Sequence, residues 1–219
     1  MTAYMRPTWW ARGFASLYDP FLWAGERVGM RRHRRALLAE AHGRVLEIGA
    51  GTGLNVPHYP ADLAELILTE PDPSMHRRLV RRHDGRATIV PAAAHRLPFE
   101  DRSVDTVVST LVLCTVGDPE ATLREIRRVL RLDGQLLLIE HVRSHARSLA
   151  AAQRLLRRPW ASFARGCRCD QETPELLRAC GFRSELRRAR WHAMPPIVGP
   201  LVVGRAVPRL NAEPMVLGA

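Results

Sequence analysis

The sequence contains no lysine, so all 33 of its basic residues are arginine. Against 22 acidic residues they leave a formal net charge of +11, which by itself favours nucleic acid or an anionic surface as a partner. The arginines are dispersed along the chain, however, and no helix-turn-helix, RNA-binding or zinc-finger pattern accompanies them. We therefore expect no nucleic-acid partner, and an acidic substrate or a weak peripheral membrane contact stays open.

Long apolar runs are also lacking. No stretch approaches the roughly 18 consecutive apolar residues that a spanning helix needs. The first residues, 1–14, carry aromatics and arginines but no continuous apolar segment before a small-residue cleavage site, as a secretory signal would. These two features predict a cytoplasmic location.

Cysteine is scarce, and its spacing is uninformative. None of the four cysteines forms a CxxC pair, and Cys-Arg-Cys at 167–169 is not accompanied by further ligands at suitable spacing. We expect no disulfide and no metal site, but ordinary or pocket-lining thiols at Cys114, Cys167, Cys169 and Cys180.

From residue 44 onward, β-rich runs alternate with amphipathic stretches. The predicted strands are 44–48, 65–69, 87–90, 104–109 and 135–141. The predicted helices are 74–83, 119–130 and about 149–163. Asp118 and Pro119 suit a helix start, and Leu132-Asp133-Gly134 reads as the turn into the next strand. Because strands such as LLLI (136–139) are almost continuously apolar, the sheet is covered on both faces, which predicts a doubly wound α/β domain.

Residues 1–42 precede this alternation and form a predicted N-terminal helical cap. Three interpretations stay open for its aromatic residues: core of the cap, a lid over a pocket, or an interfacial element on a membrane. They are Trp9, Trp10, Phe14, Tyr18, Phe21 and Trp23. With no linker or repeat in view, we expect one domain over 1–219, whose core is 43–219.

The segment VLEIGAGTG (45–53) predicts a ligand site. In an open parallel sheet, ligands bind beyond the carboxyl ends of the strands, and glycines there let the backbone approach closely. The spacing of Gly49, Gly51 and Gly53 is not the GxGxxG of dinucleotide-binding turns. Glu47 precedes the glycines, and an acid there suits a cofactor with a positive amino group better than a pyrophosphate.

Four ordered motifs carry a family resemblance. VLEIGAGTG, LTEPDPSM (68–75), HRLPFEDRSVDTVVSTLVL (95–113) and VLRLDGQLLLIEHV (129–142) resemble the motifs of class I S-adenosylmethionine-dependent methyltransferases. The resemblance implies a mostly parallel seven-stranded, Rossmann-like sheet with S-adenosylmethionine as cofactor and S-adenosylhomocysteine as product. Within that class, GTGLNVPHYP, LVLCTVGDPEATLREIRRVL and PPIVG are similar to the thiol S-methyltransferase-like branch.

The resemblance also implies roles for individual residues. We expect the three glycines to approach the cofactor, Glu47 to bind its amino end, and Glu70, followed by Pro71, to bind its ribose. The backbone of Ala94 or His95 is expected at the adenine, and further cofactor-side candidates are Asn55, Thr110 and Leu111. For acceptor activation the first candidate is His141, which alternatively fixes the end of its strand, and weaker candidates are Asp170 and His192.

The sequence thus predicts a methyltransferase for a small-molecule acceptor, with a thiol as the most specific interpretation. The alternative acceptor is a phospholipid amine, a quinone-like ring or another secondary metabolite, methylated at nitrogen, oxygen or carbon. A non-catalytic cofactor-binding protein is the alternative from another class. The oligomeric state is not predicted.

Overall fold

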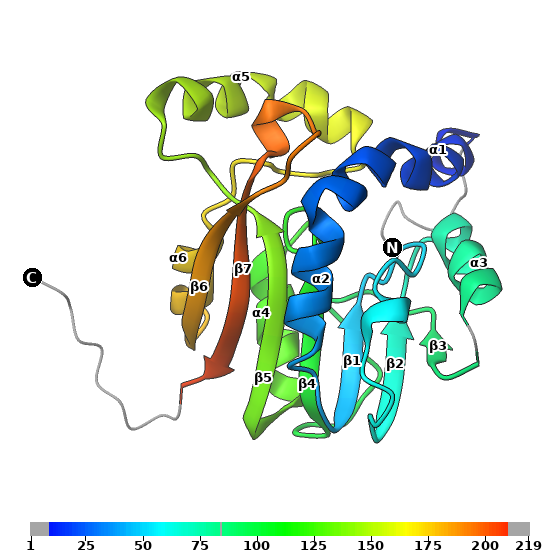
Figure 1. Cartoon of the computed structure of the whole chain (residues 1–219). Coiled ribbons are helices and arrows are strands. Elements are labelled where there is room, and N and C mark those ends of the chain that lie inside the picture. The colour runs from blue at the N-terminus through cyan, green and yellow to red at the C-terminus, as the bar shows by residue number, and fades with distance from the viewer. Residues whose placement is uncertain (1–8, 84, 210–219) are drawn as a thin grey trace, which may run out of the picture.

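The computed structural model describes residues 9–83 and 85–209, with side chains from residue 13 onward. A seven-stranded sheet in the order β3-β2-β1-β4-β5-β7-β6 crosses the molecule (Figure 1). Neighbouring strands from β3 to β5 pair in parallel, while β7 is antiparallel to both β5 and β6. The strands are β1 (Arg44–Ile48), β2 (Glu65–Thr69), β3 (Thr88–Val90), β4 (Val104–Thr110), β5 (Leu130–His141), β6 (Phe182–Arg190) and β7 (Pro200–Pro208). The predicted doubly wound, mostly parallel seven-stranded sheet is confirmed.

One predicted turn is wrong. β5 begins at Leu130, so Leu132-Asp133-Gly134 lies inside the strand rather than ahead of it. The pairing of β5 with β4 shifts register there, between Val104 and Thr106. Gly134 permits this irregularity, because a Cβ at that position would approach the carbonyl oxygen of Asp105 to 3.0 Å. The turn residues therefore make a bulge in a continuous strand.

Helices cover both faces of the sheet (Figure 1). The helices after the first strand are α3 (Pro73–Arg82), α4 (Pro119–Val129), α5 (Arg147–Phe163) and α6 (Thr173–Ala179). The predicted start of α4 is confirmed, since the side chain of Asp118 accepts a hydrogen bond from the amide of Ala121 at 2.8 Å. Adjacent apolar residues of one strand, such as Val107 and Val108, belong to the cores on opposite faces. This explains why the strands lack polar alternation.

From residue 9 to β1 the described chain is mainly helical, as predicted. It consists of α1 (Trp9–Gly25), a kinked π-helical turn (Glu26–Met30) and α2 (Arg31–Leu38). α2 lies along one face of the sheet, while α1 crosses the end where β1 and β2 finish and lies near α5 (Figure 1). The side chains of Trp9 and Trp10 lie outside the described residues. Within the described chain, none of the helices combines the length and apolarity needed to span a bilayer.

Candidate active site

The glycine turn after β1 has a backbone that glycine alone adopts easily. Gly49, Gly51 and Gly53 have φ values of 56°, 59° and 83°. A Cβ at Gly49 would clash with Val112 at 2.9 Å, and one at Gly53 would clash with Leu79 at 2.9 Å. At Gly51, in contrast, the nearest atom to an added Cβ is 4.0 Å away. The first and third glycines are thus needed for packing, whereas the second faces open space that a ligand can approach.

Glu70 ties the end of β2 to this turn. Its carboxylate accepts hydrogen bonds from the amides of Gly51 and Asp72, both at 2.8 Å. Burial is the main cause that raises the pKa of Glu70 to about 7. Each carboxylate oxygen accepts one of these bonds and keeps a further lone pair, so the group can still accept the two hydroxyls of a ribose.

Glu47 lies in a buried polar network on the other side of the turn. Its carboxylate accepts hydrogen bonds from Asn55 Nδ2 at 2.8 Å and from the Tyr59 hydroxyl at 2.7 Å. Asn55 in turn accepts a bond from Arg34 at 2.8 Å, and Arg34 forms a buried ion pair with Glu26 at 2.9 Å. Burial raises the pKa of Glu47 to about 7. The N-terminal cap is therefore connected through Asn55 to the acid expected at the amino end of the cofactor.

The end of β4 completes this side of the site. Thr110 accepts a hydrogen bond from Asn55 Nδ2 at 3.0 Å. Leu111 has a φ of 59°, a left-handed conformation that is uncommon for a non-glycine residue. Its amide donates to the carbonyl of Ile139 at 2.8 Å, which holds this strained turn in place.

The remaining cofactor candidates lie at the ends of β2 and β3. Pro71 is half-buried directly after Glu70. Ala94 is buried at 7% exposure among the apolar residues of one core, while the side chain of His95 is exposed. The roles of Pro71, Ala94 and His95 toward the cofactor stay predictions.

An apolar cavity of about 310 Å³ lies next to the strand ends, between α1 and α5. Among its described lining residues there is no arginine, aspartate or glutamate. From α1 it is lined by Phe14, Leu17, Tyr18, Pro20, Phe21 and Leu22. Its other lining residues include Leu111, Cys114, Thr115, His141, Trp160, Phe163, Ala164, Cys167, Trp191, Met194 and Val198. Three of the predicted cap aromatics thus lie over a pocket, as a lid would, and Trp23 is 60% exposed.

His141 is the one acceptor-side candidate that lines this cavity. Its ring stacks on Trp191 with centroids 5.8 Å apart, and burial lowers its pKa to about 4, so the ring is neutral. Asp170 instead lines a separate polar pocket and lies 3.8 Å from Arg157. His192 is exposed and does not line the apolar cavity. The structure therefore does not bring Asp170 and His192 together with His141.

Two functional features were missed from the sequence. Glu140 is fully buried and accepts hydrogen bonds from the hydroxyl of Ser109 and the amides of Val112, Leu113 and Cys114, at 2.7 to 3.3 Å. It therefore fixes the turn after β4. The sequence did carry a signal for this role, because an acid such as Glu140 within an otherwise apolar strand has to find hydrogen-bond partners when it is buried. The second feature is the approach of Cys114 to Cys167, for which the sequence carries no local signal.

The sheet order, the glycine turn and the two buried carboxyl groups at the ends of β1 and β2 define the fold and cofactor site of a class I methyltransferase. The residues present fit S-adenosylmethionine, because the open space at Gly51 is flanked by acids on either side.

The comparisons with known proteins agree. A family model described as a methyltransferase domain matches residues 46–138. The human thiol S-methyltransferase TMT1B is 36% identical over 184 residues, which cover 78% of this chain and 73% of the relative. A phosphatidylethanolamine N-methyltransferase of Cereibacter sphaeroides is 33% identical over 151 residues, 65% of this chain and 72% of the relative.

A solved structure supports the fold. The SAM-dependent methyltransferase of Thermotoga maritima superposes with a TM-score of 0.70 at 23% identity, over 91% of this chain and 99% of that one. The chain belongs to the class I S-adenosylmethionine-dependent methyltransferases, and in sequence it resembles their thiol S-methyltransferase branch.

Proposed function

We propose that this methyltransferase acts on a small apolar thiol. The observation that carries the proposal is the uncharged cavity of about 310 Å³, which lies between α1 and α5 and reaches Leu111 at the carboxyl end of β4. A volume of this size suits a small molecule rather than a macromolecule. The similarity to thiol S-methyltransferases over most of the chain supports sulfur as the accepting atom.

The residues around the cavity have three tasks in such a reaction. S-adenosylmethionine supplies a sulfonium methyl group for in-line displacement. Thr110 and Leu111 separate the cofactor side from the acceptor side, and their fixed backbone holds the two reactants in line. The aromatic residues of α1 limit the access of water to the acceptor side of the cavity. His141, neutral and lining the cavity, helps to position the acceptor thiol.

A matched substrate panel tests the proposal. Purified protein, S-adenosylmethionine and equal concentrations of an alkyl thiol, the corresponding alcohol and the corresponding amine are incubated, and methylated products are measured by mass spectrometry. We expect the thioether to form at least about tenfold faster than the other two products. Methylation of the alcohol or amine in preference to the thiol would refute the thiol assignment while leaving the enzyme class intact. Binding of the cofactor without any transfer would favour a non-catalytic protein.

A phospholipid amine is the second candidate acceptor. It is favoured by the similarity to phosphatidylethanolamine N-methyltransferase and by exposed apolar side chains on α1 and α5 near the cavity. The exposed fraction is 64% for Leu17 and 80% for Leu155. The test is transfer of labelled methyl groups to phosphatidylethanolamine in vesicles. Efficient transfer there, with none to alkyl thiols, would replace the thiol proposal.

A further inference from the structure

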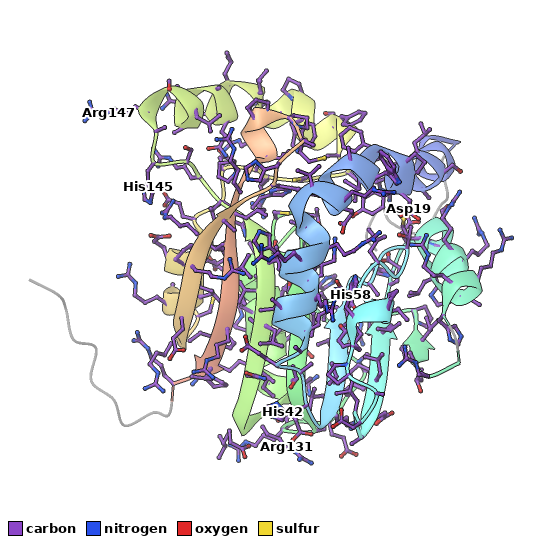
Figure 2. The ribbon with its side chains drawn as sticks, in the orientation of Figure 1. Asp19, His42, His58, Arg131, His145 and Arg147 are labelled. Atoms are coloured by element: carbon purple, nitrogen blue, oxygen red, sulfur yellow. The ribbon has the colours of Figure 1, made fainter. Side chains whose placement is uncertain are left out.

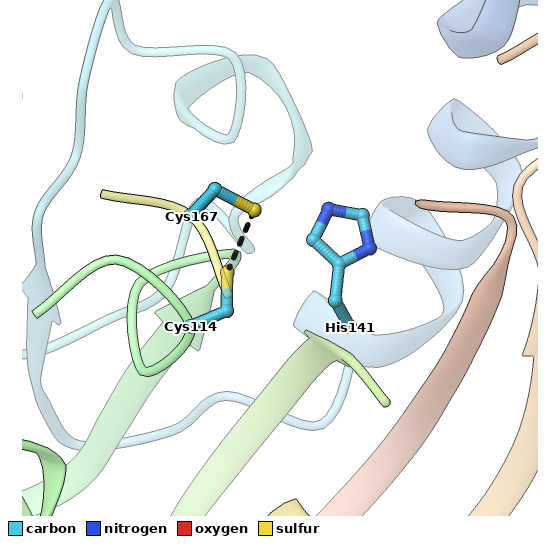
Figure 3. Close-up of side chains that lie close together, drawn as sticks. All are labelled: Cys114, His141 and Cys167. Carbon is cyan, nitrogen blue, oxygen red and sulfur yellow. Dashed lines mark hydrogen bonds between the residues drawn. The ribbon is translucent and has the colours of Figure 1, made fainter. Parts of the chain in front are cut away.

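Three side chains with metal-binding atoms meet at the cavity wall (Figure 3). Cys114 comes from the turn after β4, His141 is the last residue of β5, and Cys167 lies in the loop after α5. The two Sγ atoms are 3.9 Å apart, and all three ligand atoms lie within 4.8 Å of one another. Figure 3 shows the imidazole ring opposite the two sulfurs.

The spacing of the sulfurs matches a zinc site. With Zn–S bonds of about 2.3 Å and tetrahedral angles, two thiolates lie about 3.8 Å apart. The observed Sγ–Sγ distance of 3.9 Å therefore needs no adjustment. The imidazole has to move by only about 1 Å, because a zinc-bound nitrogen lies about 3.6 Å from a zinc-bound sulfur. Rotation about the Cβ–Cγ bond of His141 can present either ring nitrogen to the sulfurs.

The burial of the cluster gives a second, independent indication. Cys114, His141 and Cys167 are 0%, 4% and 5% exposed. Within the described chain, the Nδ1 atom of His141 is buried and has no hydrogen-bond partner. Figure 3 shows that the other ring nitrogen, Nε2, faces the two sulfurs, so the ring as it stands already presents a ligand atom to the cluster. The amide of Cys114 donates to Glu140 at 3.3 Å, so the backbone of one ligand is already fixed.

We propose that Cys114, His141 and Cys167 bind a zinc ion whose fourth position faces the cavity and takes the sulfur of the methyl acceptor. No fourth side chain among the described residues joins the cluster. Three protein ligands and an open position distinguish a catalytic zinc site from a closed structural one. The assignment of the acceptor sulfur as the fourth ligand rests on the proposed function. The assignment of the three protein ligands is independent of it.

The zinc ion activates the acceptor thiol. The thiol binds through its sulfur and loses its proton to solvent, because coordination makes the thiolate the stable form at neutral pH. A lone pair of that sulfur then forms the new S–CH₃ bond. The bond from the methyl group to the sulfonium sulfur breaks, and its electron pair stays on the departing sulfur. The product thioether is uncharged and binds zinc more weakly than a thiolate, so it leaves without any change of oxidation state.

The first measurement is the metal content of the wild-type protein. Protein purified under reducing conditions is stripped with a chelator, titrated with zinc and analysed by plasma mass spectrometry after gel filtration. We expect about one tightly bound zinc per chain. Cobalt(II) in its place should give the visible absorption of a tetrahedral thiolate site. Failure of the reduced wild-type protein to bind either metal would overturn the proposal, as would a Cys114–Cys167 disulfide that forms in preference to metal binding.

Variants assign the ligands. Cys114→Ser and Cys167→Ser should each lose the stoichiometric zinc and the cobalt absorption. Cys180→Ser is the matched control, because Cys180 is a half-buried cysteine directly after α6 that does not line the cavity. Calorimetry with S-adenosylmethionine checks that the variants are folded. Retention of full zinc binding by both ligand variants would refute the assignment.

Activity separates this proposal from the proposed function. Removal of zinc should lower thiol methylation at least about tenfold, and added zinc should restore it. If the zinc-free protein methylates thiols at the same rate, the catalytic role of the ion is wrong. If zinc binds to these three residues but the enzyme methylates only amines or alcohols, the thiol acceptor is wrong and the metal site stands.

Discussion

At the residue scale, Glu47 and Glu70 are two buried carboxyl groups on either side of the glycine turn. Burial raises the pKa of each to about 7, so near neutral pH both are partly protonated before a ligand arrives. With the amino group of the cofactor beside Glu47 and its ribose hydroxyls donating to Glu70, as predicted, both contacts would favour the charged carboxylate. We therefore expect cofactor binding and proton release to be linked.

We expect the affinity for S-adenosylmethionine to rise with pH through the pKa of about 7. Below that pKa each carboxyl group has to lose its proton before it can bind the cofactor as a carboxylate. The affinity for the cofactor therefore falls by up to about tenfold per pH unit for each group. Calorimetry at about pH 6.5, in two buffers of different ionisation enthalpy, measures the released protons. Glu70→Gln should weaken binding about tenfold or more and flatten the pH dependence. Unchanged affinity over this pH range would contradict the linkage.

A buried ion pair links the cap to the same site. Arg34 and Glu26 have side-chain exposures of 5% and 10%, and Arg34 also donates to Asn55. Replacing Arg34 alone by Met leaves the charge of Glu26 buried without its partner, so we expect a loss of about 3 kcal/mol in the free energy of unfolding. The double variant Arg34→Met, Glu26→Leu should recover much of that loss, as measured by urea unfolding. A double variant less stable than Arg34→Met would show that the ion pair is not the cause.

At the element scale, α1 is held onto the glycine turn. Asp19, labelled in Figure 2, accepts hydrogen bonds from the Thr52 hydroxyl and from Arg82 of α3, both at 2.6 Å. Thr52 lies within the glycine turn, so this contact links α1 to that turn. On the other side, Phe21 of α1 contacts the ring of Phe163 of α5, with centroids 5.8 Å apart.

Asp19→Ala should loosen α1 and shorten the residence of the cofactor. We expect the dissociation rate of S-adenosylmethionine to rise about three- to tenfold, because two hydrogen bonds, one of them an ion pair, are lost. Faster hydrogen–deuterium exchange in α1 would accompany it. The matched control is Glu65→Ala, which removes the ion pair of Glu65 with Arg44 at 2.7 Å, between the first residues of β1 and β2. Equal effects of both variants would argue against a lid function of α1.

α5 is fixed by a single buried polar side chain. Gln153 is 0% exposed, and the carbonyl oxygens of Val142, Cys169 and Ile197 lie 2.8 to 3.2 Å from its Nε2, whose two hydrogens they share. It also accepts a bond from the amide of Ser144 at 2.8 Å. These bonds attach α5 to the loops at the end of the sheet, where α5 forms one wall of the apolar cavity and α1 forms the opposite wall.

At the scale of the whole molecule, apolar side chains are exposed near the cavity in a protein of net charge +11. α1 and α5 lie at one end of the molecule, whereas Arg131 and His42 mark the opposite end of the sheet (Figure 2). Trp23 on α1 and Leu155 on α5 are 60% and 80% exposed. Such a face, on a cationic protein, suits a peripheral contact with anionic lipid.

We expect weak binding to anionic vesicles that decreases as salt increases, because much of the attraction is electrostatic. The double variant Trp23→Asp, Leu155→Asp should reduce the bound fraction in co-sedimentation several-fold. Leu132→Asp is the control, since Leu132 is 56% exposed in the bulge of β5 and belongs to neither helix. If Leu132→Asp reduces vesicle binding as much as the double variant does, the added negative charge alone explains the loss.

The strands from β1 to β5, the helices α3 to α5 and the cofactor turn were predictable because their signals are local, whereas no residue range was predicted for α6, β6 or β7. The glycines of 49–53 specify a turn through their own φ angles, and Asp118 caps α4 within three residues of its own position. The predicted bounds of β1 and β2 coincide with the observed ones. The order of four such segments along the chain was enough to indicate the methyltransferase class and its methyl donor.

The acceptor side was decided only by tertiary structure, because its residues come from distant segments. The aromatic pattern of 1–42 is compatible with a core, a lid or a membrane contact, and only the tertiary structure shows that α1 packs beside α5 and lines a cavity. Cys114, His141 and Cys167 are uninformative in the sequence, since their spacing matches no ligand motif. They meet because the turn after β4, the end of β5 and the loop after α5 pack together. The sequence by itself determined the methyl donor, and long-range packing decided which side chains face the acceptor.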